Sequence, residues 1–230
     1  CQEKLNQNQH GFLPHKSCTT QMISYVNNLS VSLNDNIRTD VVYFDFAKAF
    51  DSVNHDIILK KLKYEFEIDG TLLKFIMNYL KDRKQCVVIG GAQSDVKNVR
   101  SGVPQGSILG PLFFVLFIND MSECVSNGTH IVLYADDTKI WRKIECWNDH
   151  EILQHDIDAL HGWAERNLMK FHPDKCKVLS VFNKAVENSI WSIFLPFQIF
   201  RYTLNGVDLE FVTSEKDLGV YVTSDLNWEE

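Results

Sequence analysis

The segment Val41-Val42-Tyr43-Phe44-Asp45 places a carboxylate directly after four consecutive β-branched or aromatic residues. Such a run predicts a β-strand. A second apolar run, Ile131-Val132-Leu133-Tyr134-Ala135, is followed directly by Asp136 and Asp137. An anion at the end of a buried strand is costly unless a cation compensates it. These two places therefore differ from the other acidic residues of the chain, which we expect to be solvated surface charges.

A divalent metal ion is the natural compensation. Mg²⁺ binds carboxylate oxygens, keeps several waters and completes its octahedron with phosphate oxygens. Two strands that each end in Asp could bring Asp45 and Asp136 to one site, which is the arrangement that two-metal phosphoryl transfer uses. The residues alone leave a second interpretation open, in which Asp45 is a helix N-cap and Asp136-Asp137 is an ordinary turn.

The rest of the chain alternates irregularly between helical and strand patterns. Apolar spacing predicts helices near 22–33, 56–66, 72–81, 107–119 and 153–168. Strands are expected at 86–89, 131–134, 139–141, 176–182, 200–204 and 218–222, with a hairpin at 135–138 and a loop at 101–106. Irregular alternation with hairpin signals and no repeat favours an α+β fold over a doubly wound sheet.

Composition excludes several classes of protein. The 230 residues are 45% hydrophobic, which excludes a disordered or collagen-like chain. Acidic residues number 30 against 23 basic ones, and the net charge of -7 argues against a surface that binds nucleic acid throughout. The six scattered cysteines lack zinc-type spacing. No secretory signal opens the chain, and its longest apolar stretch, 108–118, is far short of the roughly 20 residues of a membrane span. We therefore expect an intracellular protein without a membrane anchor.

Further motifs follow the two strand ends in a definite order. The segment Phe44-Asp45-Phe46-Ala47-Lys48-Ala49-Phe50-Asp51 is followed by Gly102-Val103-Pro104-Gln105-Gly106-Ser107 and then by Tyr134-Ala135-Asp136-Asp137. In this order the three segments resemble motifs A, B and C of reverse transcriptases, most closely those of non-LTR retrotransposons. Upstream, Gln9-His10-Gly11-Phe12 resembles the Q-x-G-F segment of that family, and downstream 167–175 and 216–220 resemble its motifs D and E. A lone Tyr-x-Asp-Asp would be a weak signal, whereas ordered matches from residue 9 to 220 are specific.

The resemblance implies a polymerase palm, in which an antiparallel sheet is backed by helices. It implies Asp45 and Asp136 as metal ligands, with Asp137 as the adjacent supporting carboxylate and possible weaker ligand. The backbone carbonyl of Phe46 would complete one metal's shell. The cofactor expected from the resemblance is a pair of Mg²⁺ ions, with Mn²⁺ as an alternative.

The resemblance also implies a nucleotide site. Phe50 aligns with the bulky residue that lies beneath the incoming sugar, where an aromatic ring would clash with a 2′-hydroxyl. Gln105 and Gly106 match the loop beside the nucleotide and the template. Lys175 stands where the family carries a lysine that protonates the departing pyrophosphate or screens its charge, although an ordinary turn lysine is an equal alternative. Trp141 and Trp163 are expected to fill the core and not to stack on bases.

The domain organisation expected from the resemblance is a partial reverse transcriptase domain over residues 1–230. Residues 9–40 would form the entry from fingers to palm, 41–182 would carry motifs A to D, 183–204 would be an atypical insert that contains the apolar segment 189–200, and 205–230 would hold motif E. The thumb would be essentially absent and the fingers incomplete. We therefore expect the missing fingers and thumb segments of the parent polyprotein to be partners of this domain. We accordingly expect the 230 residues alone to extend a primer weakly or not at all.

The implied function is RNA-directed DNA polymerisation with an RNA or DNA template, a DNA primer and dNTPs, in a retrotransposon. The alternative is an inactive retroelement remnant that acts only as a nucleic-acid-binding or structural domain. An RNA-directed RNA polymerase would carry Gly at the hairpin, so Ala135 and Phe50 oppose it. A ribonuclease H type nuclease also clusters carboxylates, but it gives no reason for the segment 103–106.

Overall fold

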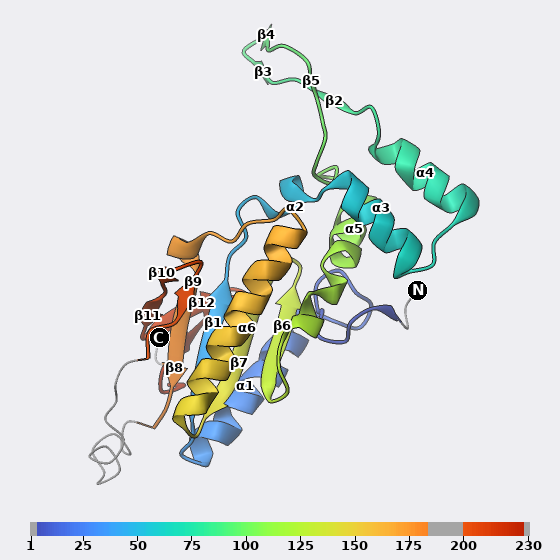
Figure 1. Ribbon diagram of the computed structural model, residues 1–230. Helices are drawn as coiled ribbons and strands as arrows, with labels where there is room; N and C mark the ends of the chain where they lie inside the picture. Colours follow the sequence, from blue (N-terminus) through green and yellow to red (C-terminus); the bar gives the residue numbers. More distant parts are fainter. Residues whose placement is uncertain (1–3, 184–199, 228–230) are drawn as a thin grey trace.

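A five-stranded sheet lies at the centre of the protein (Figure 1). The computed structural model describes residues 4–183 and 200–227, so most of the apolar segment 189–200 lies outside the described residues. The strand order is β11-β8-β1-β7-β6. The strands are β1 (Arg38–Phe44), β6 (Thr129–Tyr134), β7 (Asp137–Ile144), β8 (Lys177–Val181) and β11 (Glu210–Val212).

Strand β1 is the middle strand, and it runs antiparallel to both of its neighbours. Phe44 lies opposite Thr138 of β7, and Tyr43 lies opposite Lys177 of β8. Strands β6 and β7 form an antiparallel hairpin, whereas β11 pairs with β8 in parallel. The α+β fold with a mainly antiparallel sheet is therefore confirmed.

Helices cover both faces of this sheet. One face carries α6 (Trp147–Arg166), and its core continues through α5 (Leu109–Phe117) to α3 (His55–Tyr64) (Figure 1). The other face carries α1 (Cys18–Asn34). Side chains alternate along a strand, so Val42 and Phe44 join the core beneath α6 while Val41 packs with Tyr25 and Leu29 of α1. Within the described residues, no helix is both long and apolar enough to cross a membrane.

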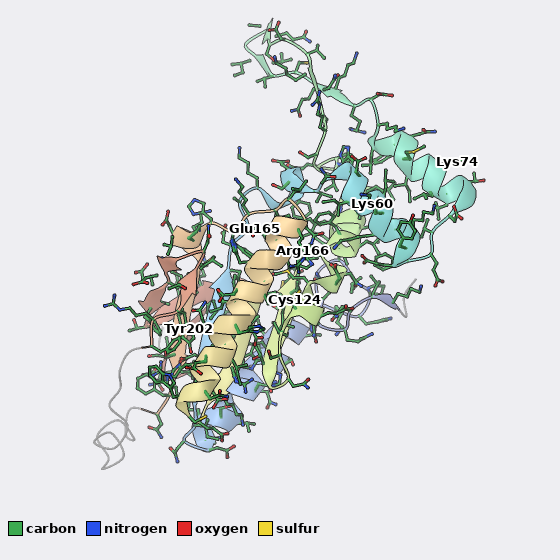
Figure 2. All side chains as sticks on the ribbon, viewed as in Figure 1. Lys60, Lys74, Cys124, Glu165, Arg166 and Tyr202 are labelled. Carbon is green, nitrogen blue, oxygen red and sulfur yellow. The ribbon has the colours of Figure 1, made fainter. Side chains whose placement is uncertain are left out.

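The remaining elements connect these layers and extend beyond them. They are α2 (Ala49–Ser52), α4 (Gly70–Leu80), η2 (Asn119–Cys124), η3 (Pro173–Lys175), β2 (Lys84–Gln85), β3 (Val88–Ile89), β4 (Ala92–Gln93), β5 (Lys97–Asn98), β9 (Thr203–Leu204), β10 (Val207–Asp208), β12 (Ser214–Asp217) and β13 (Val220–Thr223). Strands β2 to β5 form an arm that projects away from the sheet, with side chains exposed on both of its sides (Figures 1 and 2). The arm therefore adds little to the core.

Several element boundaries differ from the sequence prediction. The strand expected at 86–89 is interrupted, because residues up to Gln85 pair in β2 and pairing resumes in β3 at Val88. Leu168 lies beyond the end of α6 in a left-handed conformation and is exposed, so it is not part of the helix's buried stripe. Leu218 belongs to the turn between β12 and β13 and not to a strand. Trp141 and Trp163 are buried in the core, as expected.

A fully buried carboxylate ties the middle of the sheet to the C-terminal segment. Asp40 of β1 accepts hydrogen bonds from Arg38 Nε at 2.7 Å, from Ser180 Oγ at 2.7 Å and from Tyr202 Oη at 2.8 Å. Tyr202, labelled in Figure 2, also lies 2.7 Å from His150 Nδ1 of α6. Because each partner comes from a different part of the chain, this network locks β1, β8, α6 and residue 202 together.

Candidate active site

The three carboxylates singled out in the sequence lie at one end of the sheet. Asp45 directly follows β1, and Ala135 and Asp136 form a two-residue turn because Tyr134 pairs with Asp137. Since β1 and β7 are adjacent, this pairing brings Asp45 and the turn to the same edge. The hairpin expected at 135–138 is therefore tighter than predicted, and Asp137 is already the first residue of β7.

The carboxylates repel one another. Partial burial raises the pKa of Asp136, and the charge of Asp45 raises it further. Burial raises the pKa of Asp137 to about 6; the charges of Asp136 and Asp217 act in the same direction, and Lys139 opposes them. Both effects disfavour the ionised forms, so a cation bound at this edge would relieve a real electrostatic cost.

The donor set fits a hard divalent cation. All three side chains offer oxygen atoms, which are the ligands that Mg²⁺ prefers. In the part of the chain that the structure describes, no group of three or more His, Cys, Asp or Glu side chains converges closely enough to form a metal site by itself. A Mg²⁺ ion here would thus depend on water and substrate oxygens to complete its shell, and the assignment of Asp45, Asp136 and Asp137 as ligands stays a prediction.

Lys175 lies beside Asp45. Its Nζ is 3.6 Å from Asp45 Oδ1, with 59% and 43% of the two side chains exposed. The contact is set by the backbone, because His172 N donates to Asp45 O at 2.8 Å and η3 then carries Lys175 back over the end of β1. An exposed ion pair of this kind contributes at most about 1 kcal/mol, so the ammonium group can leave Asp45 for another anion at small cost.

Phe46 and Phe50, the two phenylalanines of motif A that follow Asp45, occupy different environments. The ring of Phe46 is buried and stacks on Phe171 with 4.3 Å between centroids, so only its backbone can reach the site. The ring of Phe50 is half-buried and stacks on Phe114 of α5 at 4.4 Å. This stacking fixes the orientation of the Phe50 ring while leaving part of it accessible.

The motif B loop, residues 102–107, is hydrogen-bonded to the segment that follows Asp45. Val103 N donates to Phe50 O at 2.9 Å, and Gln105 Nε2 donates to Asp51 Oδ1 at 2.9 Å. Gly102 has φ +90, and a Cβ there would lie 3.0 Å from both Cα and O of Asp51. The loop can approach this closely only with glycine at 102. Asp51 thus holds the Gln105 side chain at the base of the loop.

Sequence analysis missed a buried ion pair beside the site. Lys139 of β7 binds Asp217 of β12, and both residues are almost fully buried. Lys139 Nζ also lies 3.4 Å from Gln21 Oε1 and 4.4 Å from the centroid of the Tyr25 ring. The available signal was weak, because Lys139 lies between Thr138 and only two apolar residues, Ile140 and Trp141. The pair joins β7 to the β12–β13 hairpin and to α1.

A cleft of about 130 Å³ opens between these elements. It is lined by charged side chains from β7, η3, β12 and the end of β1, namely Asp45, Asp137, Lys139, Lys175, Glu215, Lys216 and Asp217. The cleft can therefore receive a charged, hydrated ligand, and the β12–β13 hairpin forms one of its walls.

Comparison with known proteins identifies relatives of the chain. Residues 1–215 match the family described as "Reverse transcriptase (RNA-dependent DNA polymerase)". The RNA-directed DNA polymerase from mobile element jockey of Drosophila melanogaster is 30% identical over 77% of this chain. The corresponding protein of Drosophila funebris is 28% identical over 96% of it. The chain spans 19% and 23% of these two relatives, respectively.

Solved structures support the same fold. A structure of apo telomerase from Candida tropicalis, truncated from its C-terminal domain, covers 96% of this chain with a TM-score of 0.63 and 11% sequence identity. A telomerase from Candida albicans, in complex with a fragment of telomeric RNA, covers 91% with a TM-score of 0.59. The match covers 40% of the Candida tropicalis telomerase chain and 33% of the Candida albicans one.

Replacing Asp217 by Leu should destabilise the protein strongly, because it leaves the buried Lys139 without its counter-charge. We expect a loss of about 3–5 kcal/mol in the free energy of unfolding measured with urea. The Lys139→Met/Asp217→Leu double variant should recover most of that loss. Asp208→Leu is the control, because the Arg201–Asp208 pair is exposed and its loss should cost only about 0–1 kcal/mol. Equal losses for the two single variants would contradict a structural role for the buried pair.

The motif B glycines should differ in their tolerance of a methyl group. Both Gly102 and Gly106 have positive φ, but a Cβ at 106 would meet no atom within 4 Å. Gly106→Ala should therefore cost only the strain of the left-handed conformation, about 1–2 kcal/mol. Gly102→Ala should cost about 1–3 kcal/mol more through its contacts with the Asp51 backbone. Thermal unfolding of the two variants tests the difference, and equal melting temperatures would refute the close approach.

Proposed function

Because the chain belongs to the reverse transcriptase family, we propose that it carries out the nucleotidyl transfer of RNA-directed DNA synthesis. In this reaction the 3′-hydroxyl of a primer gives up its proton to water and its oxygen attacks the α-phosphorus of a dNTP. The bond between that phosphorus and the oxygen bridging to the β-phosphorus breaks, and pyrophosphate leaves. The observation that carries the proposal is the meeting of Asp45 and the Ala135-Asp136 turn at one edge of the sheet. The ends of the two strands carry carboxylate oxygens close together, where a bound cation would offset their mutual repulsion.

We assign two Mg²⁺ ions to Asp45, Asp136 and Asp137, with the backbone carbonyl of Phe46 as a further oxygen donor and Mn²⁺ as a substitute ion. When bound, these ions supply the positive charge that activates the attacking oxygen and stabilises the leaving group. The raised pKa values of Asp136 and Asp137 support this assignment, because burial and then the neighbouring carboxylates disfavour their ionised forms, which a bound cation would stabilise.

Lys175 is proposed to act on the leaving group. Its ammonium group lines the cleft and makes an exposed contact with Asp45. There it can donate a proton to an oxygen of the departing pyrophosphate, or stabilise the negative charge of that oxygen. This role requires Lys175 Nζ to exchange Asp45 for a phosphate oxygen, which the weakness of the exposed pair permits.

Phe50, Gln105 and Gly106 are proposed to contact the incoming nucleotide. The ring of Phe50 is backed by Phe114, so it cannot easily move away from a bulkier sugar. We therefore assign it the exclusion of the 2′-hydroxyl. Gln105 offers an exposed amide and Gly106 an open stretch of backbone with no atom near its Cα substituent position, as close contact with a nucleotide or template requires.

The proposed partners are an RNA template, a DNA primer and dNTPs. The net charge of -7 is compatible with them, because carboxylates gathered at a metal site are offset when the ions bind. The chain spans about a fifth of the jockey relatives, so the activity of the whole protein also depends on segments outside this sequence.

Primer extension on an RNA template tests the metal assignment. The 230 residues are flanked by the corresponding neighbouring segments of the Drosophila funebris jockey polymerase, and extension is followed with Mg²⁺ or Mn²⁺. Asp136→Asn should lower the rate by about 100-fold to 1,000-fold, the usual effect of removing one electrostatic group from an active site. Glu151→Gln, an exposed change on α6, should leave the rate unaltered.

Two results would contradict this assignment. Equal extension by wild type and Asp136→Asn would refute the metal site. If neither Mg²⁺ nor Mn²⁺ supports extension by the wild type while the intact jockey polymerase is active, the chain is better described as an inactive remnant that binds nucleic acid or serves a structural role.

Ribonucleotide incorporation tests the role of Phe50. Phe50→Ala should raise the ratio of rNTP to dNTP incorporation by about 10-fold or more, since steric exclusion worth about 1–3 kcal/mol is removed. Phe114→Leu removes the ring that backs Phe50 but keeps Phe50 itself, so it should raise this ratio in the same direction and by less than Phe50→Ala does. An unchanged ratio in Phe50→Ala would show that another residue selects the sugar.

A further inference from the structure

We propose that Gln9 is a positioning residue that holds the Ala135-Asp136 turn in the conformation that the chemistry at Asp136 requires. The inference deepens the proposed function and rests on it for the meaning of Asp136. Its structural basis is independent of that function, because it comes from contacts between the N-terminal segment and the turn.

The backbone of residues 8–10 runs along the end of β6. His10 N donates to Leu133 O at 2.8 Å, and Leu133 N donates to Asn8 O at 2.9 Å. Gln9 thereby forms a parallel bridge with Leu133. These bonds pair the backbone N–H and C=O of Leu133 at the outer edge of β6, just before the turn. They fix the position of Gln9 along the strand relative to Ala135.

The Gln9 side chain then reaches the turn itself. Its Oε1 accepts hydrogen bonds from Ala135 N at 3.0 Å and from Gly11 N at 2.6 Å, and only 3% of the residue is exposed. In a two-residue turn the first central N–H has no partner in the strand ladder. Ala135 is itself buried, so an unsatisfied N–H there would be unfavourable.

Ala135 needs this support for a second reason. Its φ is +54, a left-handed conformation that is unfavourable for every residue with a Cβ. A strained residue at a functional site persists only when its surroundings determine its conformation. The hydrogen bond from Ala135 N to Gln9 is one such determinant, and Asp136 is the next residue along the chain.

Gly11 makes the approach of this segment to the turn possible. A Cβ at Gly11 would lie 2.5 Å from Ala135 N and 3.1 Å from Tyr134 C. Any side chain at residue 11 would therefore push the segment away from the turn. Gln9 and Gly11 thus act together on the turn. Gly11 allows the segment to approach closely, and Gln9 supplies the hydrogen-bond acceptor.

The test compares Gln9→Met with Gln154→Met in the 230-residue chain. Gln154 is a matched control, because its amide also bonds a backbone, accepting from Thr203 N at 2.8 Å and donating to Thr203 O at 2.9 Å. Hydrogen exchange of the Ala135 amide is measured by NMR, and Mn²⁺ affinity by electron paramagnetic resonance.

In Gln9→Met we expect the Ala135 amide to exchange at least about 10-fold faster and the Mn²⁺ affinity to fall by about 10-fold to 100-fold, as loss of a group that orients a metal ligand typically causes. Gln154→Met should change neither quantity, even if it is equally destabilised. Gln9→Glu keeps an acceptor oxygen and should retain the protection of the Ala135 amide.

Wild-type amide protection in Gln9→Met would overturn the contact. Faster exchange with unchanged Mn²⁺ affinity would overturn the positioning role, since Gln9 would then serve stability alone. If wild type and Gln154→Met also bind no Mn²⁺, the metal assignment of the proposed function fails and the role of Gln9 fails with it. That outcome is distinguishable because it is common to all variants.

Discussion

Backbone pairing between β1 and β7 is the constraint on which the candidate site depends. The register that sets Phe44 opposite Thr138 also sets Asp45 level with the turn that carries Asp136. A slip of one residue would turn every side chain of β1 to the opposite face, exchanging the core beneath α6 with the core beneath α1. Because β8 pairs with the other edge of β1, such a slip would have to break two ladders at once. The two ladders therefore fix where Asp45 lies relative to the turn.

Two lysines compensate the negative charge at this edge of the sheet in different ways. Lys139 is buried and paired with Asp217, so its charge is a fixed part of the fold. Lys175 is exposed and contacts Asp45 across 3.6 Å, so its charge can be redirected. A buried pair is costly to break, whereas an exposed pair is not. The negative charge at this edge is thus compensated in part by a fixed ion pair and in part by a lysine that can move.

Local patterns were sufficient to predict the strands that end in Asp45 and Asp136, because each is a short apolar run bounded by polar residues. They failed at Leu168 and Leu218, where an apolar residue adopts a left-handed conformation outside a regular element. They could not reveal the partner of Lys139, because the ion pair forms only when β12 packs beside β7. The metal and nucleotide roles of the candidate residues came from the resemblance and remain predictions.

The contact between Gln9 and Ala135 also has a consequence for the order in which the protein is made. The two residues are separated by 126 positions, and long-range contacts form only after the intervening chain has been ordered. During synthesis the N-terminal segment leaves the ribosome long before β6 and β7 exist. The Ala135-Asp136 turn is therefore completed only when an earlier-made segment joins a later-made one, so the candidate site becomes ordered after β6 and β7 have formed.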